Sequence, residues 1–138
     1  MRYLLDTNAI VDLTSGRYPE LISRLRLFSM KQLAVFAVTI GELQFGESKT
    51  QRPSRSLAYL DRMLGQLTVI PVGEIEARTY GRIRANLERR GKAIGNNDMF
   101  IAACAQCHDF TLVTRDTDEF GRIEDLRIED WTLEVRSE

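Results

Sequence analysis

The fold is set by a short stretch at the start of the chain, Met1-Arg2-Tyr3-Leu4-Leu5-Asp6-Thr7-Asn8. Tyr3, Leu4 and Leu5 are apolar without alternation, a pattern typical of a strand that is buried on both faces in a parallel sheet. Asp6 then lies at the carboxyl end of this strand, where open α/β sheets bind their ligands. The stretch therefore predicts an acidic site at one edge of a sheet, provided that other acidic residues arrive there too.

Length and charge limit the class of protein. A chain of 138 residues has the size of one domain that folds without disulfides or a structural metal, so we expect a single domain over residues 1–138. The net charge of -1 gives no overall attraction to nucleic acid or to an anionic membrane. No apolar run approaches the roughly 20 residues of a membrane span, and Asp6 interrupts the first one, so we expect a cytoplasmic protein without a secretory leader.

Beyond Asn8, apolar stretches of strand length alternate with stretches of helical spacing. We expect strands over residues 33–38, 69–72 and 112–114 and near 127–128, helices over 9–13, 40–47 and 98–107, further helices after Pro19 and Pro53, and a long basic helix that Gly91 ends. Residues 115–120 are typical of a polar turn. The alternation predicts an α/β fold with a central, mostly parallel sheet of four to five strands flanked by helices.

Acidic residues recur at the predicted carboxyl ends of these strands. Asp6 follows the first strand, and Glu42 lies three residues after Thr39, one turn into the helix that leaves the second. Asp98 begins the apolar helix that precedes the fourth strand, and Asp116 follows that strand by two residues. Four anions this close repel one another unless a cation shares them. Carboxylate, Asn and Thr oxygens are hard ligands, which suit Mg²⁺ or Mn²⁺ rather than zinc.

Each carboxylate also has an ordinary structural explanation. Residues 39–42, Thr-Ile-Gly-Glu, match a helix capping box in which Glu42 only satisfies the backbone. Asp98 complements a helix dipole, Asp6 suits the N-cap of the helix after it, and Asp116 is a typical turn residue. The coincidence of all four at one predicted edge is what favours a metal site.

Four sequence blocks around these acids resemble the PIN-domain nucleases, and most closely the VapC-type toxins of bacterial toxin–antitoxin pairs. The blocks are residues 4–8, 39–43, 94–98 with 101–103, and 112–116 followed by Phe120. They occur in the right order and cover nearly the whole chain. The resemblance implies a single PIN-like domain, a three-layer sandwich with the sheet between helices.

The resemblance also implies a function. It is that of a Mg²⁺-dependent endoribonuclease that cuts RNA, is held inactive by a cognate antitoxin and commonly forms a homodimer; Mn²⁺ is the expected substitute ion. The implied catalytic and metal-binding residues are Asp6, Glu42, Asp98 and Asp116, with Thr7, Asn8, Asn97 and Thr114 as supporting polar residues. Many relatives carry Asn at the position of Asp116, and Asp118 stands two residues on, so either acid can complete the site; we favour Asp116.

The chemistry expected at such a site is phosphodiester hydrolysis assisted by one or two metal ions. The chain contains a single histidine, His108. Cleavage of RNA without a metal usually requires two positioned acid–base groups, so the scarcity of histidine is consistent with a metal-dependent reaction.

The segment Cys104-Ala105-Gln106-Cys107-His108 matches the C-x-x-C-H pattern of covalent haem attachment. Because such haem proteins are exported and these cysteines fall late in an apolar helix, a c-type haem protein is a remote alternative. A redox role is disfavoured because reactive C-x-x-C pairs lie at helix amino termini. Zinc needs more ligands than two Cys and one His close in sequence supply. We expect buried, inert thiols and a histidine at the helix end.

An aspartate after the first strand is compatible with a different enzyme class as well. Aspartate-nucleophile phosphotransferases share this placement, but they typically carry a second Asp where this chain has Asn8. A PIN-type nuclease acting on DNA and a catalytically silent interaction module also remain open, and messenger, transfer and ribosomal RNA are all candidate targets. The basic residues 78–92 are expected to contact the phosphate backbone. The helix that carries Leu57, Leu60 and Leu64 is either a partner surface or part of the core.

Overall fold

The structure, a computed structural model, describes residues 1–134 and has a five-stranded sheet at its centre. The strands are β1 (Tyr3–Leu5), β2 (Leu33–Phe36), β3 (Thr68–Ile70), β4 (Thr111–Val113) and β5 (Ile128–Glu129). The helices are α1 (Thr7–Ser15), α2 (Pro19–Leu25), α3 (Ala37–Ser48), α4 (Arg55–Met63), α5 (Glu74–Arg89), α6 (Asn96–Cys107) and α7 (Thr117–Phe120), with a 3-10 turn over Met30–Gln32. The strand order is β3-β2-β1-β4-β5 and every pairing is parallel, which confirms the predicted α/β fold.

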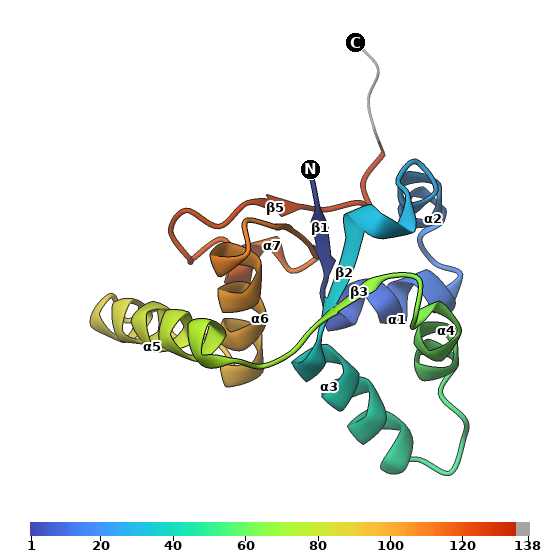
Figure 1. Cartoon of the computed structure of the whole chain (residues 1–138), viewed down its shortest axis with the longest axis horizontal. Coiled ribbons are helices and arrows are strands. Elements are labelled where there is room, and N and C mark those ends of the chain that lie inside the picture. The colour runs from blue at the N-terminus through green and yellow to red at the C-terminus, as the bar shows by residue number, and fades with distance from the viewer. Residues whose placement is uncertain (135–138) are drawn as a thin grey trace.

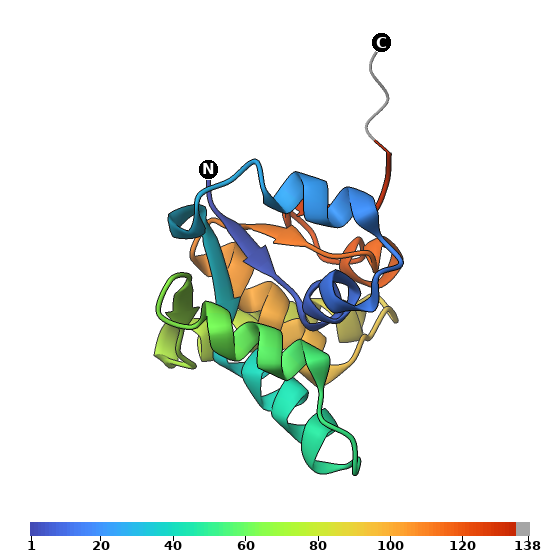
Figure 2. The same cartoon turned by 90° about the vertical axis from the view of Figure 1, so that its right-hand side faces the viewer.

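The sheet separates two layers of helices (Figure 1). One face packs against α5, α6 and α7 through a core that includes Leu4, Leu112 and Phe36. The other face packs against α1, α2 and α4 through a second core that includes Leu5 and Val35. Figure 2 looks onto this second layer and shows α2 and α4 in front of the strands. The three-layer arrangement predicted for a PIN-like fold is therefore present.

The central strands are buried because alternate side chains enter both cores. Leu4 and Leu5 point to opposite faces, as successive strand residues do, and are 0% and 1% exposed. Because neither face meets water, β1 has no polar position before Asp6. The first polar side chain therefore appears where the strand ends, at the carboxyl edge of the sheet.

The apolar run after Lys31 is split between a strand and a helix. The sequence predicts a strand that continues to Val38, but β2 ends at Phe36 and α3 begins at Ala37. A short apolar run does not by itself distinguish a buried strand from a buried helical turn, which explains the error of two residues in the predicted boundary. The boundary matters for the site because Thr39 and Glu42 both lie inside α3 and not at its cap.

One further expectation needs correction, and one alternative that the sequence left open is decided. The segment 115–120 is not only a polar turn, because Thr117–Phe120 form α7 with Asp116 as its N-cap. The apolar stripe of α4 belongs to the core, because Leu57 and Leu60 are 5% and 1% exposed, and only Leu64, beyond the helix end, is partly exposed. Within residues 1–134, every helix is too short or too polar to cross a lipid bilayer.

Candidate active site

Asp6 is a buried carboxylate between β1 and α1. It is 3% exposed, and its Oδ1 accepts a hydrogen bond of 2.6 Å from the backbone N–H of Ala9, which makes it the N-cap of α1. The pKa of Asp6 is raised to about 7, mainly by burial and to a smaller extent by the negative charges of Asp98 and Asp12, while hydrogen bonds from Thr114 and Ala9 lower it in part. Capping therefore explains the position of Asp6 but leaves its charge poorly stabilised.

Glu42 lies on α3 and is oriented by a residue of α1. The hydroxyl of Thr7 donates a hydrogen bond of 2.6 Å to Glu42 Oε1, and it also lies 3.3 Å from the hydroxyl of the buried Thr39. The capping box proposed for residues 39–42 is wrong, since Phe36 is the N-cap of α3 and no side chain caps the helix. Glu42 is thus directed across the sheet edge toward the end of β1.

Asp98 meets two acids from the segment after β4. Oxygen atoms of Asp98, Asp116 and Glu119 all lie within 4.8 Å of one another. Asp98 comes from the first turn of α6, Asp116 is the N-cap of α7, and Glu119 lies one turn further along α7. Asp6 and Glu42 lie outside this group of three, although both belong to the same edge and Glu42 lines a shallow hollow together with Asp98.

The acids at this edge repel one another. Partial burial, together with the negative charges of Glu42, Glu119 and Asp116, raises the pKa of Asp98 to about 6. Among the ion pairs formed by residues 1–134, none contains Asp6, Glu42, Asp98, Asp116 or Glu119. The fold therefore gathers carboxylates without providing a side-chain cation to compensate them.

The arrangement fits a hard divalent cation. Oxygen atoms that share one octahedral Mg²⁺ at about 2.0–2.1 Å lie about 3–4 Å from one another, and the oxygens of the group of three all lie within 4.8 Å, close enough to converge on one ion. The donors are all oxygens, with the carboxylates supplemented by Thr and Asn, a set that favours magnesium or manganese over zinc. Shared coordination would also relieve the repulsion that raises the pKa of Asp98.

Asp116 and Asp118 are placed differently relative to Asp98. Asp116 belongs to the cluster, and its backbone N–H is held by Thr114 while its Oδ1 accepts from the N–H of Glu119. The Asp118 side chain is 92% exposed and forms an ion pair with Arg122 instead. Asp116 is therefore the acid that faces Asp98.

The four predicted supporting residues are placed differently. Thr7 orients Glu42, and the buried Thr114 bonds to both Asp6 and the backbone of Asp116. Asn97 is exposed and lines the hollow between Glu42 and Asp98. Asn8 is exposed on α1. The two threonines therefore contact acids of the edge, and Asn97 lines the hollow, whereas Asn8 does neither.

Two features of this edge were not predicted from the sequence. Glu119 joins the cluster because α7 is a helix, which the spacing of an N-cap Asp and a Glu three residues later could have indicated. Buried Asp12 forms a bidentate pair with Arg115, with distances of 2.9 and 3.3 Å, and this pair joins α1 to the segment after β4. No pattern in the sequence connects residues so far apart.

The C-x-x-C-H segment does not form a haem site. Cys104 is 0% exposed in the core, so a haem vinyl group cannot reach its sulfur in this fold. Burial raises the pKa of the Cys104 thiol far above its usual value, which makes it inert, as expected. Cys107 is only half-buried, at the carboxyl end of α6. The expectation of two buried thiols is thus wrong for Cys107.

Comparison with known proteins identifies the family. The family model of the PIN domain matches residues 3–126. The chain is 35% identical over 131 residues to ribonuclease VapC2 of Haemophilus influenzae, covering 95% of this chain and 98% of the relative. It is 32% identical over 132 residues to the tRNA(fMet)-specific endonuclease VapC of Shigella flexneri, covering 96% and 99%. The solved structure of VapBC2 from Rickettsia felis, bound to a promoter DNA fragment, superimposes with a TM-score of 0.85 at 34% identity over 95% of this chain and 99% of that chain. A parallel sheet with clustered carboxylates at its carboxyl edge and these matches along nearly the whole chain agree, and the chain therefore belongs to the PIN-domain family and, within it, to the VapC ribonucleases.

Proposed function

We propose that this protein is a Mg²⁺-dependent endoribonuclease toxin of a type II toxin–antitoxin system that acts in the cytoplasm, with Mn²⁺ as a substitute ion. The observation that carries the proposal is the cluster of Asp98, Asp116 and Glu119, completed by Asp6 and Glu42, without a cationic side chain to compensate it. Ordinary folding does not require such a cluster, because like charges held together cost free energy.

The acidic residues at the edge have different roles in this proposal. Asp98, Asp116 and Glu119 would hold the cation, and the buried Asp6 would fix its inner side. Glu42, steered by Thr7, closes the opposite side of the hollow. A divalent cation bound there supplies positive charge that offsets the charge of the phosphate and of the transition state.

Carboxylates are also the acid–base groups at this edge. His108 follows Cys107 at the other end of α6. Cys107 is nine residues from Asp98, which is about 14 Å along the helix axis. No imidazole among residues 1–134 is therefore placed to accept a proton at the hollow. The mechanism relies on positioning and charge rather than on a histidine base.

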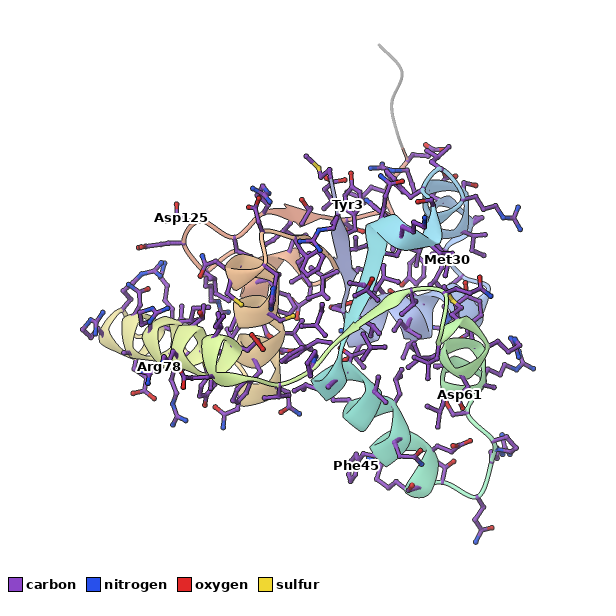
Figure 3. The ribbon with its side chains drawn as sticks, viewed as in Figure 1. Tyr3, Met30, Phe45, Asp61, Arg78 and Asp125 are labelled. Atoms are coloured by element: carbon purple, nitrogen blue, oxygen red, sulfur yellow. The ribbon has the colours of Figure 1, made fainter. Side chains whose placement is uncertain are left out.

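RNA is the expected substrate, and transfer RNA is the first RNA to test. The VapC relatives from Shigella flexneri and Salmonella typhimurium are tRNA(fMet)-specific endonucleases, at 32% and 33% identity. Arginines on the exposed face of α5 could contact the phosphate backbone; the Arg78 side chain, for example, is 69% exposed, although it pairs with Glu74 on the same helix (Figure 3). Such contacts position the RNA but do not select its sequence.

Two protein partners are expected, an antitoxin and a second copy of the chain. The solved relatives from Rickettsia felis and Salmonella typhimurium are VapBC complexes bound to DNA. A groove beside Glu42, lined by Val11, Leu43 and Pro53, is largely apolar and suits an antitoxin segment that would cover the acidic edge. Val69, Val72 and Ile75 are 40%, 52% and 61% exposed beside the edge strand β3, and they suit contact between two copies.

The proposal is tested by cleavage of purified tRNA with wild type, Asp6→Asn and Asp98→Asn in Mg²⁺, with mapping of the new RNA 5′ ends. We expect each variant to lose at least about 100-fold in cleavage rate while keeping its circular dichroism spectrum, because a ligand for the cation is removed. Chelation by EDTA should stop the wild type, and Mn²⁺ should restore it.

Asp61→Asn is the matched control. Asp61 is an exposed acid on α4 (Figure 3) and is not among the residues that line the hollow, so its substitution removes the same charge and should leave cleavage unchanged. Full activity in both Asp6→Asn and Asp98→Asn would overturn the assignment of the site. Cleavage of DNA in preference to every RNA tested would overturn the substrate class.

A further inference from the structure

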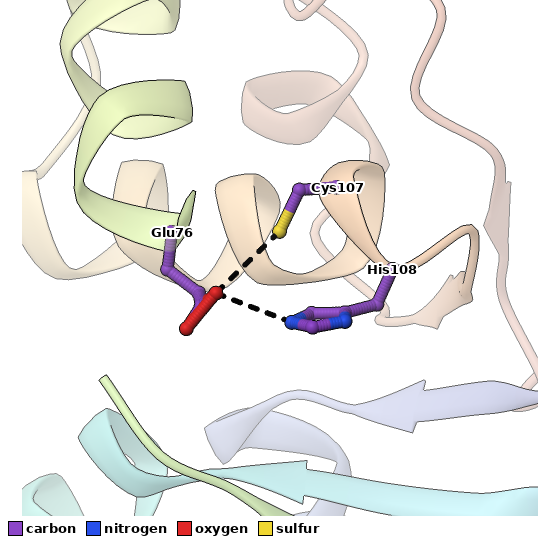
Figure 4. A group of neighbouring side chains, drawn as sticks. All are labelled: Glu76, Cys107 and His108. Carbon is purple, nitrogen blue, oxygen red and sulfur yellow. Dashed lines mark hydrogen bonds and ion pairs between the residues drawn. The ribbon is translucent and has the colours of Figure 1, made fainter. Parts of the chain in front are cut away.

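A second group of ligand-type side chains lies at the opposite end of α6 from Asp98. Glu76 comes from the first turn of α5, and Cys107 and His108 come from the end of α6 (Figure 4). Oxygen, sulfur and nitrogen atoms of the three residues all lie within 4.8 Å of one another. Glu76 Oε2 is 3.2 Å from His108 Nε2 and 3.9 Å from Cys107 Sγ. We call this group the Glu–Cys–His cluster.

The chemistry of the Glu–Cys–His cluster is that of a zinc site and not of a magnesium site. Thiolate, imidazole and carboxylate are the three side-chain ligands that zinc accepts, and three protein ligands with one open position are a common zinc arrangement. With bonds of about 2.0–2.3 Å in a tetrahedron, neighbouring ligand atoms lie about 3.2–3.8 Å apart. The distance of 3.2 Å from Glu76 to His108 lies in this range, the distance of 3.9 Å from Glu76 to Cys107 lies just above it, and the third pair lies within 4.8 Å.

The cluster is also held in place as a metal site requires. Glu76 is 5% exposed, and its second oxygen, Oε1, accepts a hydrogen bond of 2.9 Å from the N–H of Gly73. This contact directs Oε2 toward the other two residues, as the outer hydrogen bonds of metal ligands do. The rings of Tyr80 and Phe100 stack at 3.8 Å between the same two helices and fix their spacing. His108 is 31% exposed, so an ion can enter from solvent.

The geometry points to a binding site for one zinc-like transition-metal ion, held by Glu76, Cys107 and His108 and clipping the start of α5 to the end of α6. Binding breaks the S–H bond of Cys107, forms a metal–sulfur bond and releases the proton to solvent. The site is separate from the acidic edge, about 14 Å away along α6, and it differs from it in ligand type. It is independent of the proposed nuclease function.

Cobalt(II) is the probe, because a Co²⁺–thiolate bond produces a charge-transfer absorption in the near ultraviolet that oxygen ligands do not. The full chain is purified without a histidine tag, freed of metal, reduced, and titrated with Co²⁺ in the presence of excess Mg²⁺, which occupies the acidic edge. We expect one Co²⁺ per chain with this absorption, its displacement by Zn²⁺, and a rise in melting temperature on addition of Zn²⁺.

Variants decide which groups bind the ion. Cys107→Ser should abolish the absorption and the thermal shift, and Glu76→Gln and His108→Gln should weaken binding by at least about tenfold. Cys104→Ala removes the other thiol, and Asp98→Asn disables the acidic edge; both should keep the absorption. No thiolate absorption in the wild type, its persistence in Cys107→Ser, or its loss in Asp98→Asn would overturn the proposal. Should Glu76→Gln fail to fold, Cys107→Ser, at a half-buried position, still decides it.

Discussion

The two ends of α6 carry two clusters of potential ligands that differ in how their charge is compensated. At the amino-terminal end, Asp98 meets other carboxylates, and no ion pair within residues 1–134 neutralises them. At the carboxyl-terminal end, Glu76 is met by an N–H, a thiol and an imidazole, all of which can donate to it. Closely spaced ligand groups therefore do not by themselves distinguish the nuclease site. What distinguishes it is that its carboxylates lie at the sheet edge without compensating positive charge.

The difference predicts opposite behaviour of the two ends without metal. The acidic edge is strained by repulsion, and an ion would relieve that strain. The Glu–Cys–His cluster is satisfied by its own hydrogen bonds, so an ion there would replace contacts that already exist. Three changes test and sharpen this contrast.

The largest effect is expected from the acids of α7. Glu119→Gln removes an anionic oxygen donor from the group of three, and we expect a loss of about 100-fold or more in Mg²⁺-dependent RNA cleavage. Asp116→Asn introduces the residue that many relatives carry at this position, so we expect a smaller loss, of about tenfold. Both substitutions keep an oxygen acceptor, so the helix should survive. Cleavage rates at saturating Mg²⁺, with circular dichroism spectra of the same samples, measure this.

Asp118→Asn is the control for these variants. It stands in the same short helix, but its carboxylate is exposed and paired with Arg122, so cleavage should stay within about twofold of wild type. A loss in Asp118→Asn that exceeds the loss in Asp116→Asn would reverse the assignment of the fourth acid.

The sequence predicts those site residues whose place depends on the strands of the sheet. It does not predict the residues whose place depends on contacts between distant segments. Asp6, Glu42 and Asp98 could be placed at one edge because parallel strands bring their carboxyl ends together whatever the intervening sequence. Glu119 required knowing that Thr117–Phe120 are helical, and the polar sequence suggested a turn. Asp12 and Arg115 are 103 residues apart, a pairing that only the folded chain defines.

The Glu–Cys–His cluster likewise depends on a contact between distant segments that the sequence does not predict. The sequence displays Cys107 and His108 side by side, and two adjacent ligands are too few for zinc. Glu76 lies 31 residues earlier and reaches them because α5 packs along α6. Hydropathy predicts that such helices pack somewhere on the sheet, but not which turn of one meets which turn of the other.

A smaller effect is expected on the stability of the metal-free protein. Asp6 binds a proton more tightly in the folded state, because its pKa rises from 3.8 to about 7, so the folded chain holds more protons than the unfolded chain between these values. Stability should therefore fall as the pH rises through this window, and the penalty is complete above about pH 7. The rise corresponds to roughly 4 kcal/mol as an upper value.

Asp6→Asn should remove that penalty, since Asn stays neutral and still caps α1. In EDTA at pH 8 we expect the variant to be about 2–3 kcal/mol more stable than wild type in urea unfolding, with no gain below about pH 4. Glu76→Gln at the other end of α6 should not stabilise the protein, because the Glu76 carboxylate already has its donors. A stabilised Glu76→Gln, or a destabilised Asp6→Asn at pH 8, would contradict the contrast drawn between the two ends.

The smallest effect concerns the orientation of the Glu42 side chain, which is held by a hydrogen bond from Thr7 on the neighbouring helix α1. Thr7→Val keeps the shape of the side chain but removes the hydroxyl that donates to Glu42 Oε1 at 2.6 Å. We expect about a tenfold loss in cleavage and a higher Mg²⁺ concentration for half-maximal rate, because the carboxylate is no longer directed at the hollow. Unfolding free energy should fall by about 1 kcal/mol, since one hydrogen bond is lost while Val and Thr have similar helix propensities. Thr14→Val is the matched control on the same helix, where the hydroxyl bonds to the carbonyl of Val11. Equal losses in the two variants would mean that α1 acts as a whole and that Thr7 has no specific part in positioning Glu42.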